Sequence, residues 1–193
     1  MWSALLLSTA VIFVAELGDK SQLMALTFAT RYRARDVLIG ITVATAVVHL
    51  GSVALGFWVA AAFAASQHWV SVAAGLAFLV FAAWTLRGDE LSEDERTKAQ
   101  RSGGRAIWAV GGAFFLAELG DKTMLATITL ATREDWVGTW IGSTLGMVAA
   151  DAIAIAVGAL LGRNLPERAV RYGAAALFAL FGIWLVAEGL GWL

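Results

Sequence analysis

Long apolar stretches separated by short polar segments make up most of the chain. Residues 37–86 contain no Asp, Glu, Lys or Arg, and their only polar cluster is Ser66-Gln67-His68. A membrane-spanning helix takes about 20 residues, so this stretch is too long for one crossing and we expect a turn at that cluster. Extended along the chain, the pattern predicts six helices, at residues 2–30, 36–64, 69–87, 106–132, 136–162 and 169–192.

Composition places these helices in a membrane. Of 193 residues, 60% are hydrophobic and 15% charged, whereas soluble domains have about 45–50% apolar and about 25% charged residues. Helices satisfy their own backbone hydrogen bonds in lipid, and the alternation of a membrane barrel is absent. We therefore expect an all-α integral membrane protein. The net charge of −1 gives no reason to expect a nucleic-acid partner, and a chain without cysteine has no thiolate for metal binding or nucleophilic attack.

Basic residues are concentrated in alternate loops of the six-helix pattern. The segments that join helices 1–2, 3–4 and 5–6 carry 11 of the 14 Lys and Arg residues, and the opposite loops hold only Arg133. The positive-inside rule then places both termini outside and the central loop, 89–105, in the cytoplasm of a multi-pass inner-membrane protein. Tryptophans at the expected outer ends agree with an interfacial aromatic belt; they are Trp2, Trp69, Trp136, Trp140 and Trp192.

The chain repeats itself at an offset of 102 residues. Glu16-Leu17-Gly18-Asp19-Lys20-Ser21 aligns with Glu118-Leu119-Gly120-Asp121-Lys122-Thr123. Each half contains three helices, an odd number, so the second half enters the bilayer from the opposite side. We expect six transmembrane helices as two inverted three-helix repeats, residues 1–88 and 106–193, joined by the cytoplasmic linker 89–105. Secondary transporters have this organisation, with substrate bound near the midplane where the halves meet.

Seven charged residues interrupt the apolar stretches. An ionisable group at the bilayer midplane costs roughly 2.5–3.5 kcal/mol, so these groups need a shared site. Five are carboxylates and two are lysines, which leaves three negative charges for a cation or protons to neutralise. They are Glu16, Asp19, Lys20, Glu118, Asp121, Lys122 and Asp151.

On a continuous helix, each motif would present its Glu and Asp on one face, with its Lys four residues after the Glu. The helix at 2–30 would be about 43 Å long against a hydrocarbon core of about 30 Å, so a tilt or a break near Gly18 would reconcile the two lengths. The motifs could instead be intrahelical Glu–Lys pairs that hold the halves together. Because that role would leave Asp19 and Asp121 unpaired in the bilayer, the motifs favour a cation site.

Oxygen ligands narrow the choice of cation. Carboxylates and hydroxyls suit hard divalent ions such as Mn²⁺, Ca²⁺ and Mg²⁺, and a monovalent ion would need fewer negative charges. The cation is expected as the transported substrate, with no resident cofactor. Its expected ligands are Glu16, Asp19, Ser21, Glu118, Asp121 and Thr123.

Other residues are candidates for a ligand or proton-coupling role. Asp151 and His49 coincide at the 102-residue offset, and Asp151 has no local counter-ion. Histidine changes charge near neutral pH, which suits proton coupling, although His49 could instead be a hydrogen-bonded packing residue. Gln22 follows the first motif, and Met124 takes the equivalent place. Lys20 and Lys122 are the other candidates.

Two copies of E-x-G-D-[KR]-[ST] in a six-helix inverted repeat resemble the Mn²⁺/Ca²⁺ transporter family of Golgi transmembrane protein 165, which includes the bacterial MneA-type manganese exporters. That family looks like a distant branch of the cation/Ca²⁺ exchanger superfamily, and the resemblance covers essentially the full chain. It implies export of Mn²⁺ from the cytoplasm in exchange for H⁺ by alternating access. By position, Glu16, Asp19, Glu118 and Asp121 would bind the cation. Family members often have Gln in both places after the motifs, so Met124 is a departure.

Functions other than manganese export are also compatible with parts of this pattern. The same site could serve a Ca²⁺/H⁺ antiporter or a divalent-cation channel. A more remote alternative is an exporter of small organic solutes, but a zwitterionic substrate does not need four midplane carboxylates. An intramembrane enzyme would use Asp19 and Asp121 as a dyad; since both halves carry the motif and a hydrolase nucleophile is missing, no enzymatic activity is expected. The expected partners are the divalent cation, protons and the lipid bilayer, and the sequence specifies no oligomeric state.

Overall fold

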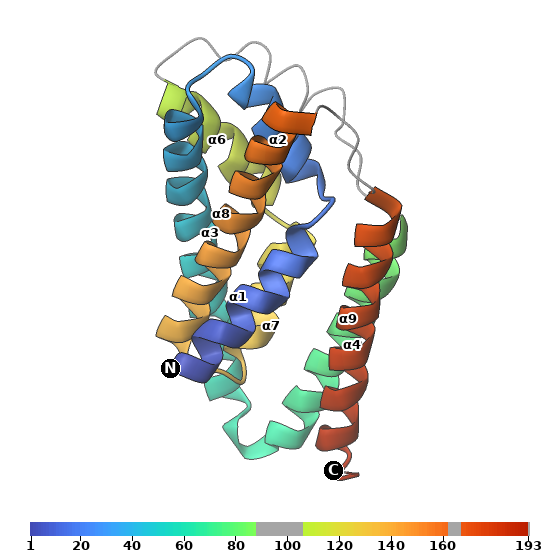
Figure 1. The fold of residues 1–193 in the computed structure, drawn as a ribbon. Coiled ribbons are helices and arrows are strands. Elements are labelled where there is room, and N and C mark those ends of the chain that lie inside the picture. Colours follow the sequence, from blue (N-terminus) through green and yellow to red (C-terminus); the bar gives the residue numbers. More distant parts are fainter. Residues whose placement is uncertain (88–105, 162–166, 193) are drawn as a thin grey trace.

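The computed structural model describes residues 1–87, 106–161 and 167–192, and every regular element in these ranges is helical (Figure 1). In chain order the elements are α1 (Trp2–Glu16), α2 (Lys20–Ala29), α3 (Ala34–Ala62), the short 3₁₀ turn η1 (Ala64–Ser66), α4 (Gln67–Arg87), α6 (Ala106–Glu118), α7 (Lys122–Ala131), α8 (Trp136–Leu161) and α9 (Glu167–Gly189). The expected cytoplasmic linker, 89–105, lies outside the described residues.

Four of the six predicted helices are continuous. The bounds of α3, α4, α8 and α9 agree with the sequence prediction to within three residues. Each of these helices is long and apolar enough to cross a membrane. The turn between α3 and α4 lies at η1, so the expected turn is confirmed at Ser66, whereas His68 already belongs to the first turn of α4.

The first and fourth predicted helices are each broken in two. Residues 2–30 form α1 and α2, whose axes differ by 77°, and residues 106–132 form α6 and α7. The prediction of one continuous helix is therefore wrong in both halves. Of the two alternatives near Gly18, a tilt or a break, the structure has the break. By length and composition the described helices give four candidate spans, or five if α1 and α2 form one span; α6 is shorter.

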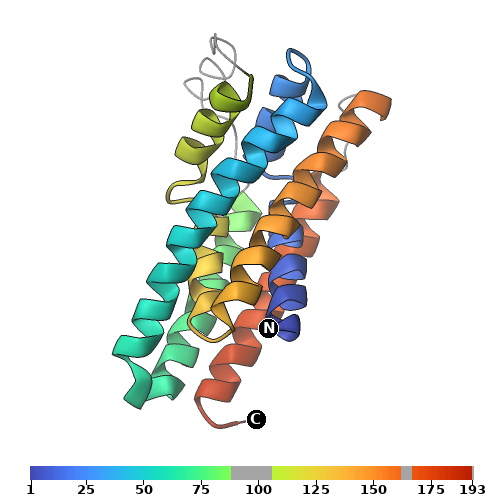
Figure 2. The ribbon, with the colours of Figure 1, turned by 90° about the vertical axis from the view of Figure 1, so that its left-hand side faces the viewer.

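The two broken helices run in opposite directions through the bundle. Figures 1 and 2 show α1 and α7 toward the end that holds both termini, with α2 and α6 toward the other end. Helix α1 packs along α8, and α3 packs along α6 and α7. Helices α4 and α9 lie side by side next to this group and pack mainly on each other (Figure 1).

Glycines permit the same close contact in both halves. A Cβ at Gly40 would lie 2.9 Å from the carbonyl oxygen of Ile107, and a Cβ at Gly142 would clash with the carbonyl of Leu5. Gly40 and Gly142 are equivalent in the repeat, as are Leu5 and Ile107. In each half, the helix that follows the broken one therefore packs on the other half through one small residue: α3 packs on α6, and α8 packs on α1.

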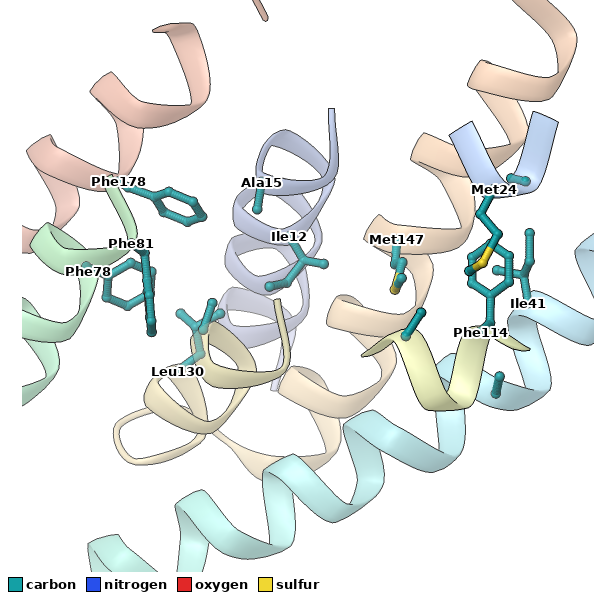
Figure 3. Close-up of a cluster of buried hydrophobic side chains, with 14 of the residues drawn as sticks. Ile12, Ala15, Met24, Ile41, Phe78, Phe81, Phe114, Leu130, Met147 and Phe178 are labelled. Carbon is teal, nitrogen blue, oxygen red and sulfur yellow. The ribbon is translucent and has the colours of Figure 1, made fainter. Parts of the chain in front are cut away.

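Buried apolar side chains form a continuous core between these helices. In Figure 3, Phe78, Phe81 and Phe178 gather on one side, and Ile12 and Met147 lie toward the centre of the view. The ring centroids of Phe78 and Phe178, from α4 and α9, are 5.7 Å apart. The aromatic cluster therefore joins the α4–α9 pair internally, while the rest of the core surrounds the two helix breaks.

Large apolar side chains also cover the outside of the bundle. Trp58 is 75% exposed and Leu180 is 64% exposed, as expected for surfaces that face lipid rather than water. Four of the five tryptophans expected at the outer ends are exposed; they are Trp2, Trp69, Trp136 and Trp192. The fifth, Trp140, is partly buried and donates its indole N–H to the carbonyl of Ala46 at 2.9 Å.

Candidate functional site

The two repeated motifs, 16–21 and 118–123, break their helices in the same way. Helix α1 ends at Glu16 and α2 begins at Lys20; between them Gly18 has φ of 77°. In the second motif Gly120 has φ of 81°. Glycine takes this left-handed conformation without the steric cost that a Cβ brings. The next residues, Asp19 and Asp121, are the N-caps of α2 and α7, with ψ of 163° and 165°.

The break changes the expected pairing of the lysines. Lys122 forms a buried ion pair with Asp19, and Lys20 Nζ lies 3.7 Å from Asp121 Oδ1. The expected arrangement, with Glu, Asp and Lys on one helical face, is wrong because the helix stops before the lysine. If the motifs were only structural ion pairs, both aspartates would be expected to be unpaired. This expectation is also wrong, since each aspartate pairs with the lysine of the other half.

The glutamates sit beside the hydroxyls of their own motifs. Ser21 donates a hydrogen bond to Glu16, and Thr123 Oγ1 donates to Glu118 Oε2 at 3.0 Å. The same hydroxyls lie 3.5 Å from Asp19 Oδ2 and Asp121 Oδ2. Both glutamates are fully buried. Within the described chain, Glu16 Oε2 and Glu118 Oε1 accept no hydrogen bond, so each has an oxygen available for a cation or a proton.

The residues after the motifs have equivalent positions and different chemistry. The backbone N–H of Gly18 donates to Gln22 Oε1 at 2.8 Å, and that of Gly120 donates to Met124 Sδ at 3.1 Å. Gln22 also donates through Nε2 to the carbonyl of Ala150 at 3.1 Å. The carbonyl of Ala150 is a contact that sequence reasoning missed, because any residue type supplies a backbone carbonyl.

Asp151 and His49 lie on α8 and α3, and both are completely buried. Neither oxygen of Asp151 and neither ring nitrogen of His49 makes a hydrogen bond in the part of the chain that the structure describes. In the described residues His49 is therefore a buried packing residue without the hydrogen bond that the packing alternative predicted. Asp151 follows Ala150, which Gln22 contacts, so Asp151 lies beside the first break.

The candidate carboxylates are close enough for their charges to repel one another; they are Glu16, Asp19, Glu118, Asp121 and Asp151. No three of the His, Asp or Glu side chains in the described ranges converge tightly enough to hold a metal ion as they stand. In this arrangement the lysine ammonium groups neutralise the two aspartates. A cation that binds there has to compete with the protein's own lysines.

Two further contacts were missed by sequence reasoning, and the repeat and charge patterns contained a signal for each. Thr45 and Met147 are equivalent at the 102-residue offset, and the Thr45 hydroxyl lies 3.4 Å from the Met147 sulfur. Residues that a two-fold repeat relates can meet where the halves join. Arg133 pairs with Glu188 at 2.7 Å; Arg133 is the lone basic residue expected on its side of the membrane.

Comparison with known proteins identifies the family. The sequence profile described as "Divalent cation/proton antiporter GDT1" matches residues 4–93 and 106–192. A Vibrio cholerae protein named "Putative manganese exporter" is 34% identical over 185 residues, which cover 94% of this chain and 89% of that protein. A GDT1-like protein of Synechocystis is 29% identical over 200 residues, covering 95% of this chain and 96% of that protein.

The chloroplast relatives are longer. Protein PAM71 of Arabidopsis thaliana is 33% identical over 211 residues, covering 92% of this chain, and the chain spans 55% of its length. No solved structure matches the chain. With a family profile that matches nearly the whole chain, the protein belongs to the GDT1 family of divalent cation/proton antiporters and is a membrane transporter, not an enzyme.

Proposed function

We propose that this protein exports Mn²⁺ from the cytoplasm in exchange for protons. The observation that carries the proposal is the pair of buried glutamates, Glu16 and Glu118, each at a helix break and each with one oxygen that accepts no hydrogen bond among the described residues. Oxygen atoms that lack hydrogen-bond donors in a buried site are suited to a cation or a proton. The family's divalent cation/proton antiport supplies both.

The proposed ligands come from both halves of the chain. They are Glu16, Asp19, Ser21, Glu118, Asp121 and Thr123. This set contains only oxygen, the ligand atom that Mn²⁺ and Ca²⁺ prefer, and the name of the Vibrio cholerae relative favours manganese. Family membership argues against the organic-solute exporter, because the family transports divalent cations.

The proposed topology has six spans in two inverted repeats, residues 1–88 and 106–193, joined by the linker 89–105. The opposite directions of the two broken helices support it (Figure 2), as does the reciprocal glycine packing of α3 on α6 and α8 on α1. The basic residues favour a cytoplasmic linker and two external termini in the inner membrane.

Alternating access follows from competition at the carboxylates. When the site opens to the cytoplasm, a divalent cation displaces the ammonium groups of Lys20 and Lys122 from the aspartates. When it opens to the outside, protons take the carboxylate oxygens and the cation leaves. Because each carboxylate binds either a proton or the cation, the two fluxes are coupled in opposite directions.

Proteoliposomes containing the purified full chain test this function. Mn²⁺ or Ca²⁺ is added outside, uptake is followed with a metal-sensitive dye, and internal pH is followed with a second dye. An antiporter releases protons from the lumen as Mn²⁺ enters, and an imposed pH gradient drives Mn²⁺ uphill. Mn²⁺ flux that is independent of proton flux would indicate a channel, and faster Ca²⁺ exchange would change the assigned substrate.

Two motif variants and one control variant test whether the motifs form the transport site. Asp19→Asn and Asp121→Asn should both abolish exchange, while Glu188→Gln should not, since it makes the same acid-to-amide change at a residue that pairs with Arg133 and lies outside the motifs. Normal exchange by both aspartate variants would show that the motifs do not form the transport site.

A further inference from the structure

Asp151 is an acidic residue of α8 that the two motifs do not contain. It is completely buried, and both of its oxygens accept no hydrogen bond in the described chain. The residue before it, Ala150, accepts a hydrogen bond from Gln22 at 3.1 Å. This contact holds α8 against the first break and places Asp151 beside the first motif.

The charge around Asp151 is not balanced. Its carboxylate interacts electrostatically with those of Asp19 and Glu16, and also with that of Glu118; the ammonium group paired with Asp19 comes from Lys122. When all three are ionised, Glu16, Asp19 and Asp151 against Lys122 leave two negative charges at the first break. One divalent cation would neutralise them, and an isolated charge left in a low-dielectric interior is costly.

The second break has a different residue in the equivalent place. His49 coincides with Asp151 at the 102-residue offset and is also completely buried. A neutral imidazole adds no negative charge, so Glu118 and Asp121 against Lys20 leave only one. The repeat therefore has similar backbones at its two breaks, and Asp151 adds a carboxylate next to the first that has no counterpart next to the second.

We infer that Asp151 is a cation ligand, and that with Glu16 and Asp19 it makes the first break the main binding position for the divalent ion. This inference rests on the proposed function and deepens it, because it assigns the cation mainly to one of the two breaks that the repeat relates. The three carboxylates do not converge in the described structure; binding draws them together as Lys122 leaves Asp19. Asp151 then needs no protein donor, because the cation is its partner.

Mn²⁺ binding to the purified full chain in detergent, measured by isothermal titration calorimetry, tests the inference. Asp151→Asn should weaken the Kd for Mn²⁺ by at least about tenfold, the smallest loss expected for a group that supports a metal site. Glu188→Gln is the matched acid-to-amide control and should keep the wild-type Kd. Asp19→Asn should abolish binding and reports on the proposed function itself.

An exchange of the two equivalent residues separates ligation from folding. Asp151→His alone should lose Mn²⁺ affinity, and Asp151→His combined with His49→Asp should recover much of it, because the carboxylate returns on the symmetry-related side. Recovery cannot come from improved folding at position 151, which carries the same histidine in both variants.

The outcomes distinguish the two proposals. Wild-type Mn²⁺ affinity in Asp151→Asn, together with loss in Asp19→Asn, would overturn the role of Asp151 and leave the proposed function in place. A wild-type protein that binds neither Mn²⁺ nor Ca²⁺ would overturn both. Tenfold weaker binding in Asp151→Asn with recovery in the exchanged variant would support both.

Discussion

The two helix breaks have the same backbone and different neighbours. Gly18 and Gly120 have φ of 77° and 81°, and the aspartates that follow cap α2 and α7 with nearly equal angles. The residues around them differ: an amide contacts one glycine N–H and a thioether contacts the other. The two breaks therefore share a glycine of positive φ and an aspartate at the N-cap, and they differ in the side chain that contacts the glycine N–H.

Removal of either buried glutamate should have the largest effect and tests whether the two breaks serve one site. We expect Glu16→Gln and Glu118→Gln each to reduce Mn²⁺ transport by more than about 100-fold, beyond the 10–100-fold typical of groups that only support a metal ligand. The measurement is the initial rate of Mn²⁺ uptake into proteoliposomes. Loss in one variant with normal transport in the other would mean that the halves act separately.

The lysines should show how unequal the two breaks are. Lys122 is almost fully buried in its ion pair, whereas the side chain of Lys20 is 19% exposed. Removal of one partner from a buried pair costs about 3–5 kcal/mol, and the cost is smaller where the remaining group can reach solvent. Lys122→Met should therefore lower the unfolding midpoint in detergent by more than Lys20→Met. Equal shifts would contradict the asymmetry of the two pairs.

Alanine in place of either glycine should test the shared backbone. A Cβ at Gly120 would meet no atom within 4 Å, so the expected cost of Gly120→Ala is the left-handed conformation alone, about 1–2 kcal/mol. Gly18→Ala should destabilise the protein by at least a similar amount, as measured by thermal unfolding.

A helical glycine provides the matched control. Gly51 in α3 also has open space around its Cβ position, and alanine there should stabilise the helix by about 0.5–1 kcal/mol. If Gly51→Ala destabilised the protein, or if Gly120→Ala left its stability unchanged, the positive φ of Gly120 would not explain the free-energy cost of alanine there.

Exchange of the residues after the motifs should have the smallest effect. Gln22→Met removes the hydrogen bond to Ala150 and should cost about 0.5–1.5 kcal/mol. Met124→Gln gives the second break the amide of the first and should change stability by less, since no partner is lost. The unfolding midpoints of the two variants provide the measurement, and a larger loss in Met124→Gln would reverse the comparison.

Much of this molecule could be predicted from the apolar pattern and the repeat. The long helices α3 and α8 follow from uninterrupted apolar sequence. The length of the first predicted helix allows either a tilt or a break near Gly18 and cannot decide between them, since α3 has 29 residues and is continuous. The cross-pairing of Asp19 with Lys122 did not follow, because the i, i+4 rule holds only while the helix continues. Residues 103 positions apart become partners through the fold, and local spacing contains no information on that contact.

The pairing of Asp19 with Lys122 has a consequence for how the protein is made. The ribosome adds about 5–20 residues per second, so Lys122, 103 residues later, follows Asp19 by roughly 5–20 s. During that interval the nascent first half contains an aspartate whose lysine does not yet exist. The Asp19–Lys122 ion pair can therefore form only after the second half of the chain has been synthesised.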